Sequence, residues 1–87
     1  MQVFMVERSL KGIAMDALAA AQKKAIETAQ NVSREGTPVR YIRTTFVPEE
    51  GSCMCLFSAE RAEDVKRVNE VAGIPFNRIV PALDLTP

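Results

Sequence analysis

Two cysteines, Cys53 and Cys55, are separated by one residue in the stretch FVPEEGSCMCLFSA, and the chain contains no histidine. Cysteine thiolates bind soft metal ions and carry out redox chemistry. In a β-strand, residues i and i+2 point to the same side, with Cα atoms roughly 6.6 Å apart. Because that separation lies at the outer limit for a disulfide, we expect no bridge within the pair.

Three roles remain open for these thiols. A structural zinc site takes four ligands, of which two thiols supply only half. A redox role requires a lowered thiol pKa and some exposure, whereas Phe46, Leu56 and Phe57 flank the pair. Buried cysteine commonly packs as a small hydrophobic side chain. Taken alone, the pair is interpreted as core packing, with metal contact and redox chemistry as the alternatives.

Composition restricts the classes of protein to which the chain can belong. Its 87 residues predict a single domain over residues 1–87. Lys plus Arg and Asp plus Glu both number 11, so no basic excess favours nucleic acid as a partner. No apolar run approaches the about 20 residues needed to cross a membrane, and the first residues do not resemble a signal peptide. We therefore expect a cytoplasmic protein with reduced thiols.

Hydrophobic periodicity divides the chain into six elements. An alanine-rich apolar stripe at helical spacing predicts a long first helix. Gly73 suits the left-handed position just past a second helix, and Pro75 follows at the expected distance. Pro81 predicts that the last strand lies at an edge or contains a bulge. The sequence predicts strands over residues 2–8, 39–47, 52–59 and 77–85, and helices over residues 14–34 and 60–72.

This βαββαβ order predicts an α+β, ferredoxin-like sandwich, with two helices on one face of a four-stranded antiparallel sheet. The other face remains open unless a partner covers it. Residues 2–8 and the hairpin carry large apolar side chains on both faces, and an exposed apolar patch usually marks an interface. We therefore expect a homodimer through the uncovered sheet face.

The PEEG loop fixes a trial register for the hairpin. Placing Val47 opposite Ser52 pairs Phe46 with Cys53, Thr44 with Cys55 and Ile42 with Phe57. Tyr41 and Arg43 then share the opposite face.

Charged side chains on that apolar surface need partners. Adjacent strand residues face opposite ways, so only one of Glu7 and Arg8 points to the helix side. A charge on an apolar surface is costly unless it is paired. Glu7 and Arg43 could form an ion pair, or could line a small ligand pocket together with Tyr41.

Three stretches carry a family resemblance: VERSLKGI, EGTPVRYIRTTFVPEEGSCMCLFSA and VNEVAGIPFNRIV. They resemble a family of small bacterial nickel-binding proteins, long known only as a domain of unknown function. The resemblance runs over nearly the whole chain. It implies a ferredoxin-like fold and a dimeric α/β barrel, similar in architecture to small stress-response barrels and antibiotic-biosynthesis monooxygenases.

The resemblance also implies site residues. Relatives place histidine where this chain has Arg43 and near Asn69, and cysteine where it has Cys55; only the cysteine is present here. Imidazole suits nickel well, so its absence argues against nickel itself. The implied metal site, for nickel or another transition metal, is Cys53 and Cys55. The expected ligand-binding cleft comprises Glu7, Tyr41, Arg43 and Asn69.

The sequence therefore predicts a small homodimer that binds a metal or a small ligand and has no catalytic activity. The alternative is a small dimeric α/β-barrel enzyme, monooxygenase-like or isomerase-like. Such an enzyme would act on a small organic substrate in the cleft between helices and sheet. Tyr41, Arg43 and Glu7 would then orient the substrate.

Overall fold

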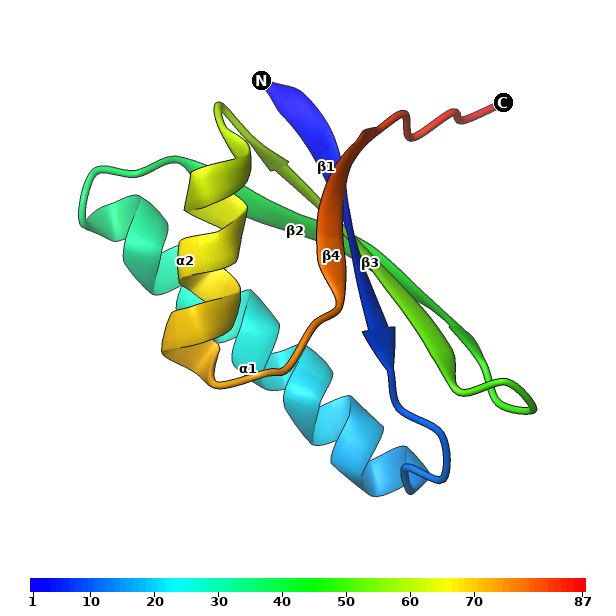
Figure 1. Ribbon diagram of the computed structural model, residues 1–87. Helices are drawn as coiled ribbons and strands as arrows, with labels where there is room; N and C mark the ends of the chain where they lie inside the picture. Colours follow the sequence, from blue (N-terminus) through cyan, green and yellow to red (C-terminus); the bar gives the residue numbers. More distant parts are fainter.

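The computed structural model describes residues 1–87 and has the predicted βαββαβ order (Figure 1). The second helix begins two residues later than predicted, and the last strand is shorter at both ends. The elements are β1 (Gln2–Ser9), α1 (Met15–Arg34), β2 (Val39–Val47), β3 (Ser52–Ala59), α2 (Ala62–Ala72) and β4 (Arg78–Ala82).

The four strands form one antiparallel sheet in the order β2-β3-β1-β4, and both helices lie on one face of it (Figure 1). This arrangement confirms the predicted α+β, ferredoxin-like fold. β4 occupies an edge, as Pro81 predicted, because proline lacks the N–H that an inner strand would need for a second neighbour.

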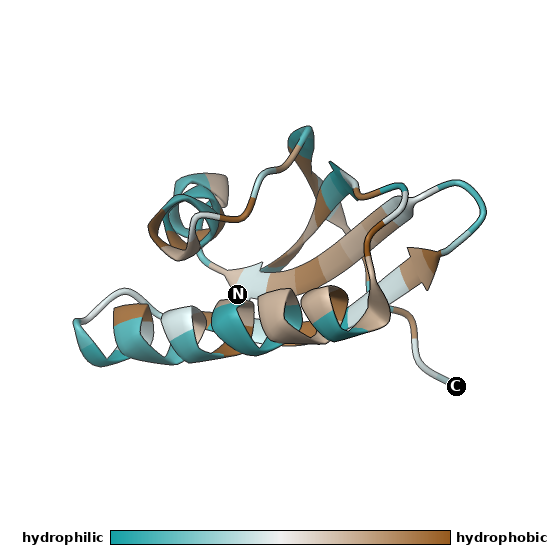
Figure 2. Cartoon of the chain, turned by 90° about the horizontal axis from the view of Figure 1, so that it is seen from below, coloured by the Kyte–Doolittle hydropathy of each residue, from teal (hydrophilic) through white to brown (hydrophobic).

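The core lies between the helices and the sheet. Small residues of α1, among them Ala25 and Ala29, are almost fully buried and let the helix approach the strands closely. In Figure 2, hydrophilic and hydrophobic residues alternate along α1, while the strands beyond it are mostly hydrophobic. Phe57 of β3 and Val65 and Val68 of α2 complete the fully buried centre. Burial of such apolar surface is the main driving force for folding.

The hairpin register is confirmed next to the loop. Val47 pairs with Ser52, and the pairs Phe46–Cys53 and Thr44–Cys55 follow. Both cysteines therefore face the helices.

A β-bulge changes the register farther along β2. Phe57 pairs with Tyr41 and Leu56 with Arg43, so Ile42 is the extra residue and its predicted pairing with Phe57 is wrong. The bulge turns Tyr41 toward the helix side, where its ring meets Phe57 edge to face at 5.6 Å between centroids. Tyr41 and Arg43 therefore do not share a face, contrary to the prediction.

The second face of the sheet carries partly exposed apolar side chains. Along β1, Val3 and Met5 alternate with the buried side chains of Phe4 and Val6. Met5 pairs with Leu56 of β3, which therefore points the same way. Neither helix covers this face, here called the open face. No helix in the structure combines the length and apolar composition needed to cross a membrane.

Candidate functional site

A cavity of about 150 Å³ lies between α1 and the helix-facing side of the sheet. Helix α1 contributes Leu18 and Ala21 to its wall, and the strands contribute Arg8, Thr44 and both cysteines. Eight of its eleven lining residues are hydrophobic. Small-molecule sites are typically concave and apolar, with a few convergent polar groups. The cavity is therefore the candidate site.

Both cysteines are free thiols that belong to the hydrophobic core and also line the cavity. Thr44 Oγ1 lies 3.2 Å from Cys55 Sγ. Burial, reinforced by the neighbouring Cys55 and opposed by Arg8, raises the pKa of the Cys53 thiol to about 11. Cys53 is therefore a neutral thiol near pH 7, unlike the low-pKa thiols of redox sites.

Arg8 is a site residue that the sequence analysis did not identify. It is 4% exposed and donates hydrogen bonds to Asn69 Oδ1 at 2.6 Å and to the Pro75 carbonyl at 3.2 Å. Asn69 is held in turn by a bond from its Nδ2 to the Val65 carbonyl. The alternation along β1 was the available signal, because a strand that buries Val6 also turns Arg8 toward the helices.

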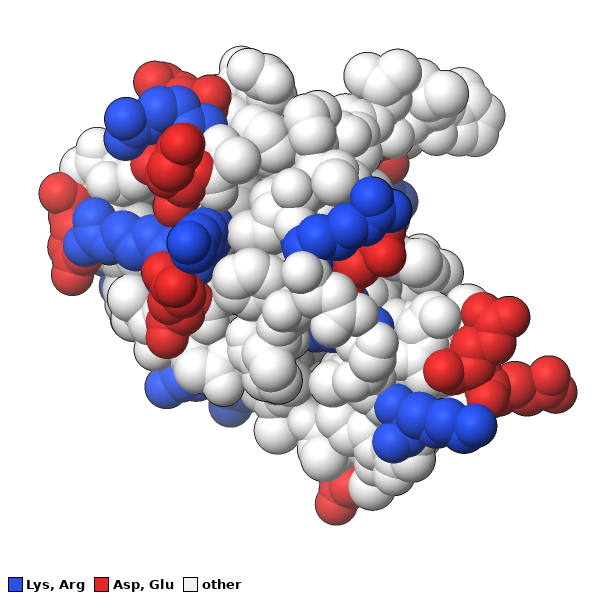
Figure 3. Space-filling model, in the orientation of Figure 1, with Lys and Arg blue, Asp and Glu red and all other residues white.

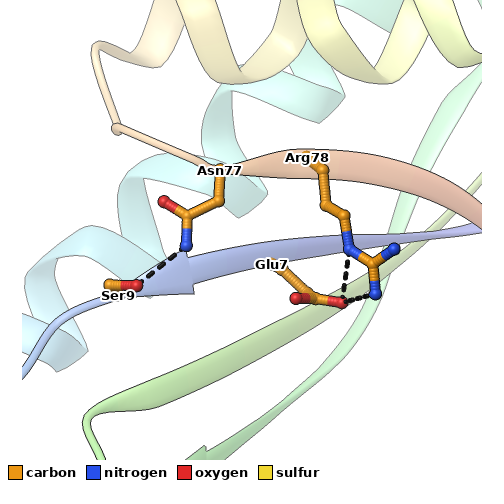
Figure 4. A network of polar contacts seen from close by, with 4 residues as sticks. All are labelled: Glu7, Ser9, Asn77 and Arg78. Atoms are coloured by element: carbon orange, nitrogen blue, oxygen red, sulfur yellow. Dashed lines mark hydrogen bonds and ion pairs between the residues drawn. The ribbon is translucent and has the colours of Figure 1, made fainter.

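Glu7 lies on the open face, where it binds Arg78 rather than Arg43 (Figure 4). Its Oε2 accepts bonds from Arg78 Nε at 2.8 Å and Nη2 at 2.5 Å. These contacts raise the pKa of Arg78. Beside them, Asn77 Nδ2 donates to Ser9 Oγ, so β4 is joined to β1 by side chains as well as by the backbone (Figure 4).

The four residues expected to form one cleft lie in three places. Glu7 and Arg43 are on the open face, and Arg43 pairs with Asp84 at 2.9 Å. The Tyr41 hydroxyl lies on the helix side, bonded to Gln22 and Thr44. Asn69 is fully buried on α2 and reaches the cavity only through Arg8. None of the four lines the cavity itself.

Nickel, which the family resemblance implies, needs more donors than the chain brings together. No group of three or more His, Cys, Asp or Glu side chains is close enough to hold a metal ion. Two thiols and a threonine hydroxyl make up the donor set around Cys55. Nickel is well served by imidazole, which is absent. The residues of one chain therefore do not fit a nickel site.

Comparisons with known proteins confirm the resemblance. The family model described as "Nickel responsive protein SCO4226-like" matches residues 4–81. The crystal structure of SCO4226 from Streptomyces coelicolor A3(2) is similar, with a TM-score of 0.78 and 27% sequence identity over 98% of this chain and 99% of that chain. No curated protein matches the chain. The chain therefore belongs to the SCO4226-like family of nickel-responsive proteins.

Proposed function

We propose that this member of the nickel-responsive family is a non-catalytic binding protein that works as a homodimer and takes a small ligand into the cavity beneath α1. The observation that carries the proposal is the cavity itself. It is a concave site lined mostly by hydrophobic residues, as ligand sites usually are, and its volume of about 150 Å³ has room for a small organic molecule.

The distribution of polar groups supports binding rather than catalysis. Glu7, Tyr41 and Arg43 were the residues expected to orient a substrate, and they point to different faces of the sheet. Inside the cavity, the thiol of Cys53 is neutral near pH 7. The other ionisable group there is the guanidinium of Arg8, and arginine does not give up its proton in proteins. Neither is a base poised to take a proton near pH 7.

The open face supports the homodimer. Its partly exposed Met5 and Leu56 form an apolar surface that the helices do not cover. Beyond β4, Leu83 and Leu85 are 80% and 83% exposed and flank Asp84, which pairs with Arg43 of β2. Large exposed apolar surfaces are typical of protein interfaces.

The cavity is tested with benzene as a probe, because an engineered protein cavity of this volume binds benzene. In ¹H–¹⁵N spectra of the full chain, benzene should shift the amides of Leu18, Ala21 and Cys53 in a saturable manner. Ala21→Leu should abolish these shifts by filling the cavity. Ala20→Leu, at an exposed position of the same helix, is the matched control and should retain them.

If benzene shifts none of the amide signals of the residues that line the cavity in the wild-type protein, the proposal is contradicted. An Ala21→Leu protein that still shows the wild-type shifts would contradict it as well.

Metal binding by Cys53 and Cys55 is the second candidate function. It is favoured by two thiols that face the same side of β3 and line the same cavity. Thiolates select soft ions such as Cu(I), whereas Ni(II) is better served by nitrogen and oxygen ligands. Membership of a nickel-responsive family supports a metal role of some kind.

A further inference from the structure

Arg8 is a buried cation without a counter-ion. Its two hydrogen bonds to oxygen have neutral acceptors, an amide of Asn69 and a carbonyl of Pro75, and it forms no ion pair. Glu7, its neighbour in sequence, points to the opposite face and binds Arg78. A buried charge is costly unless an opposite charge or a full set of hydrogen bonds compensates it.

The guanidinium also has unused donors. An arginine side chain carries five N–H protons in a planar fork; the bonds to Asn69 and Pro75 use two of them, and the Cys53 thiol accepts a third. Arg8 lines the cavity beside Cys53, and its guanidinium lowers the pKa of that thiol, so the guanidinium lies where acceptors from a bound molecule can reach it. A carboxylate matches this fork because it can accept two parallel N–H bonds.

The other residues that line the cavity indicate that the rest of the ligand is apolar. Leu10, Leu18, Phe46 and Ile74 supply apolar walls, and the volume of about 150 Å³ corresponds to a body about as large as a benzene ring. Cys53 does not oppose an anion, because its thiol is neutral near pH 7 and can donate a weak hydrogen bond.

We propose that the cavity binds a small apolar monocarboxylate, with its carboxylate on the Arg8 guanidinium and its hydrocarbon body against α1. This inference rests on the proposed ligand-binding function and names the chemical class of the ligand. The ligand supplies the missing counter-ion to Arg8, so charge and shape select it together. A neutral molecule of the same shape fills the cavity but leaves the cation uncompensated.

The test compares benzoate with benzamide, a neutral molecule of nearly the same shape, by calorimetry and ¹H–¹⁵N titration of the full chain. Benzoate should bind about tenfold or more tightly than benzamide, since hydrogen bonds between charged groups are the stronger ones. Arg8→Gln should remove that difference. Arg78→Gln, which removes an exposed arginine of the open face, is the matched control and should keep it.

Equal affinity for benzoate and benzamide in the wild type would overturn the inference while leaving the proposed function intact, provided benzene still shifts the cavity amides. Undiminished benzoate affinity in a folded Arg8→Gln protein would overturn it as well. If Arg8→Gln fails to fold, Ala21→Leu replaces it, because that variant leaves Arg8 and Asn69 in place. Filling the cavity in this way should abolish benzoate binding, and retained binding would locate benzoate elsewhere and refute the proposal.

Discussion

The register of single residues decides which chemistry this protein can carry. In β1, Glu7 and Arg8 are adjacent in sequence but face opposite sides of the sheet, so one joins a surface ion pair and the other becomes a buried cation. In β3, Cys53 and Cys55 share a side because they are two residues apart. The cavity thus receives two thiols and a guanidinium, but no carboxylate.

A metal titration tests the thiol pair at this scale. Under anaerobic conditions, untagged protein should retain one Cu(I) per chain in native mass spectrometry and should retain no Ni(II), because two cysteines that lose their protons on metal binding suit the softer ion. Replacing both cysteines by serine should abolish Cu(I) retention. A folded double variant that keeps Cu(I) would exclude the cysteines as its ligands.

How much of the site was predictable also depends on single residues. The strand alternation that buries both cysteines was correctly read from the sequence, because the loop fixes the register from Val47 onward. The role of Arg8 was missed: the alternation along β1 indicates the side on which Arg8 lies, but its hydrogen-bond partners, Asn69 and Pro75, are more than 60 residues away in the sequence. Local patterns do not contain such contacts.

At the scale of elements, the type and the order of the helices and strands were predictable, because apolar residues recur with a different period in a helix than in a strand. The β-bulge at Ile42 was not, since a bulge leaves both neighbouring segments with a normal strand pattern. Its effect is to place Tyr41 beside Phe57 and to give Thr44 a partner in the Tyr41 hydroxyl, at 2.5 Å. One extra residue thus moves a tyrosine from the open face to the core side.

Gly51 controls how the hairpin loop meets the segment that leads into α1. Its carbonyl accepts a bond from Leu10 N–H at 2.7 Å, and its φ of +73° is the left-handed conformation that favours glycine. A Cβ there would collide with the backbone of Lys11. Gly51→Ala should therefore lower the free energy of unfolding by about 3 kcal/mol, measured by urea denaturation.

Gly12→Ala is the matched control for that change. Gly12 also has a positive φ, +83°, but an added Cβ would meet no atom within 4 Å. Only the backbone strain remains, at about 1 kcal/mol. Equal losses in the two variants would mean that the contact with Lys11 does not constrain the loop.

At the scale of the whole molecule, charge does not select a partner. Basic and acidic side chains lie next to one another on the face shown in Figure 3, and the formal net charge is zero. Mixed charges of this kind give no long-range attraction toward a polyanion. Apolar surface, rather than charge, is therefore the feature on which the proposed homodimer rests.

The proposed homodimer pairs through the open face. A stable interface buries about 800 Å² per partner around an apolar centre, and Met5 and Leu56 are adjacent on neighbouring strands of that face. The wild type should sediment as a dimer at micromolar concentration. Met5→Asp combined with Leu56→Asp should sediment as a folded monomer, because two carboxylates per chain cannot be buried there without counter-ions. Val71→Asp is the control, because it changes an apolar residue that is 63% exposed on α2, and it should remain dimeric. A folded, monomeric wild type would refute the homodimer itself.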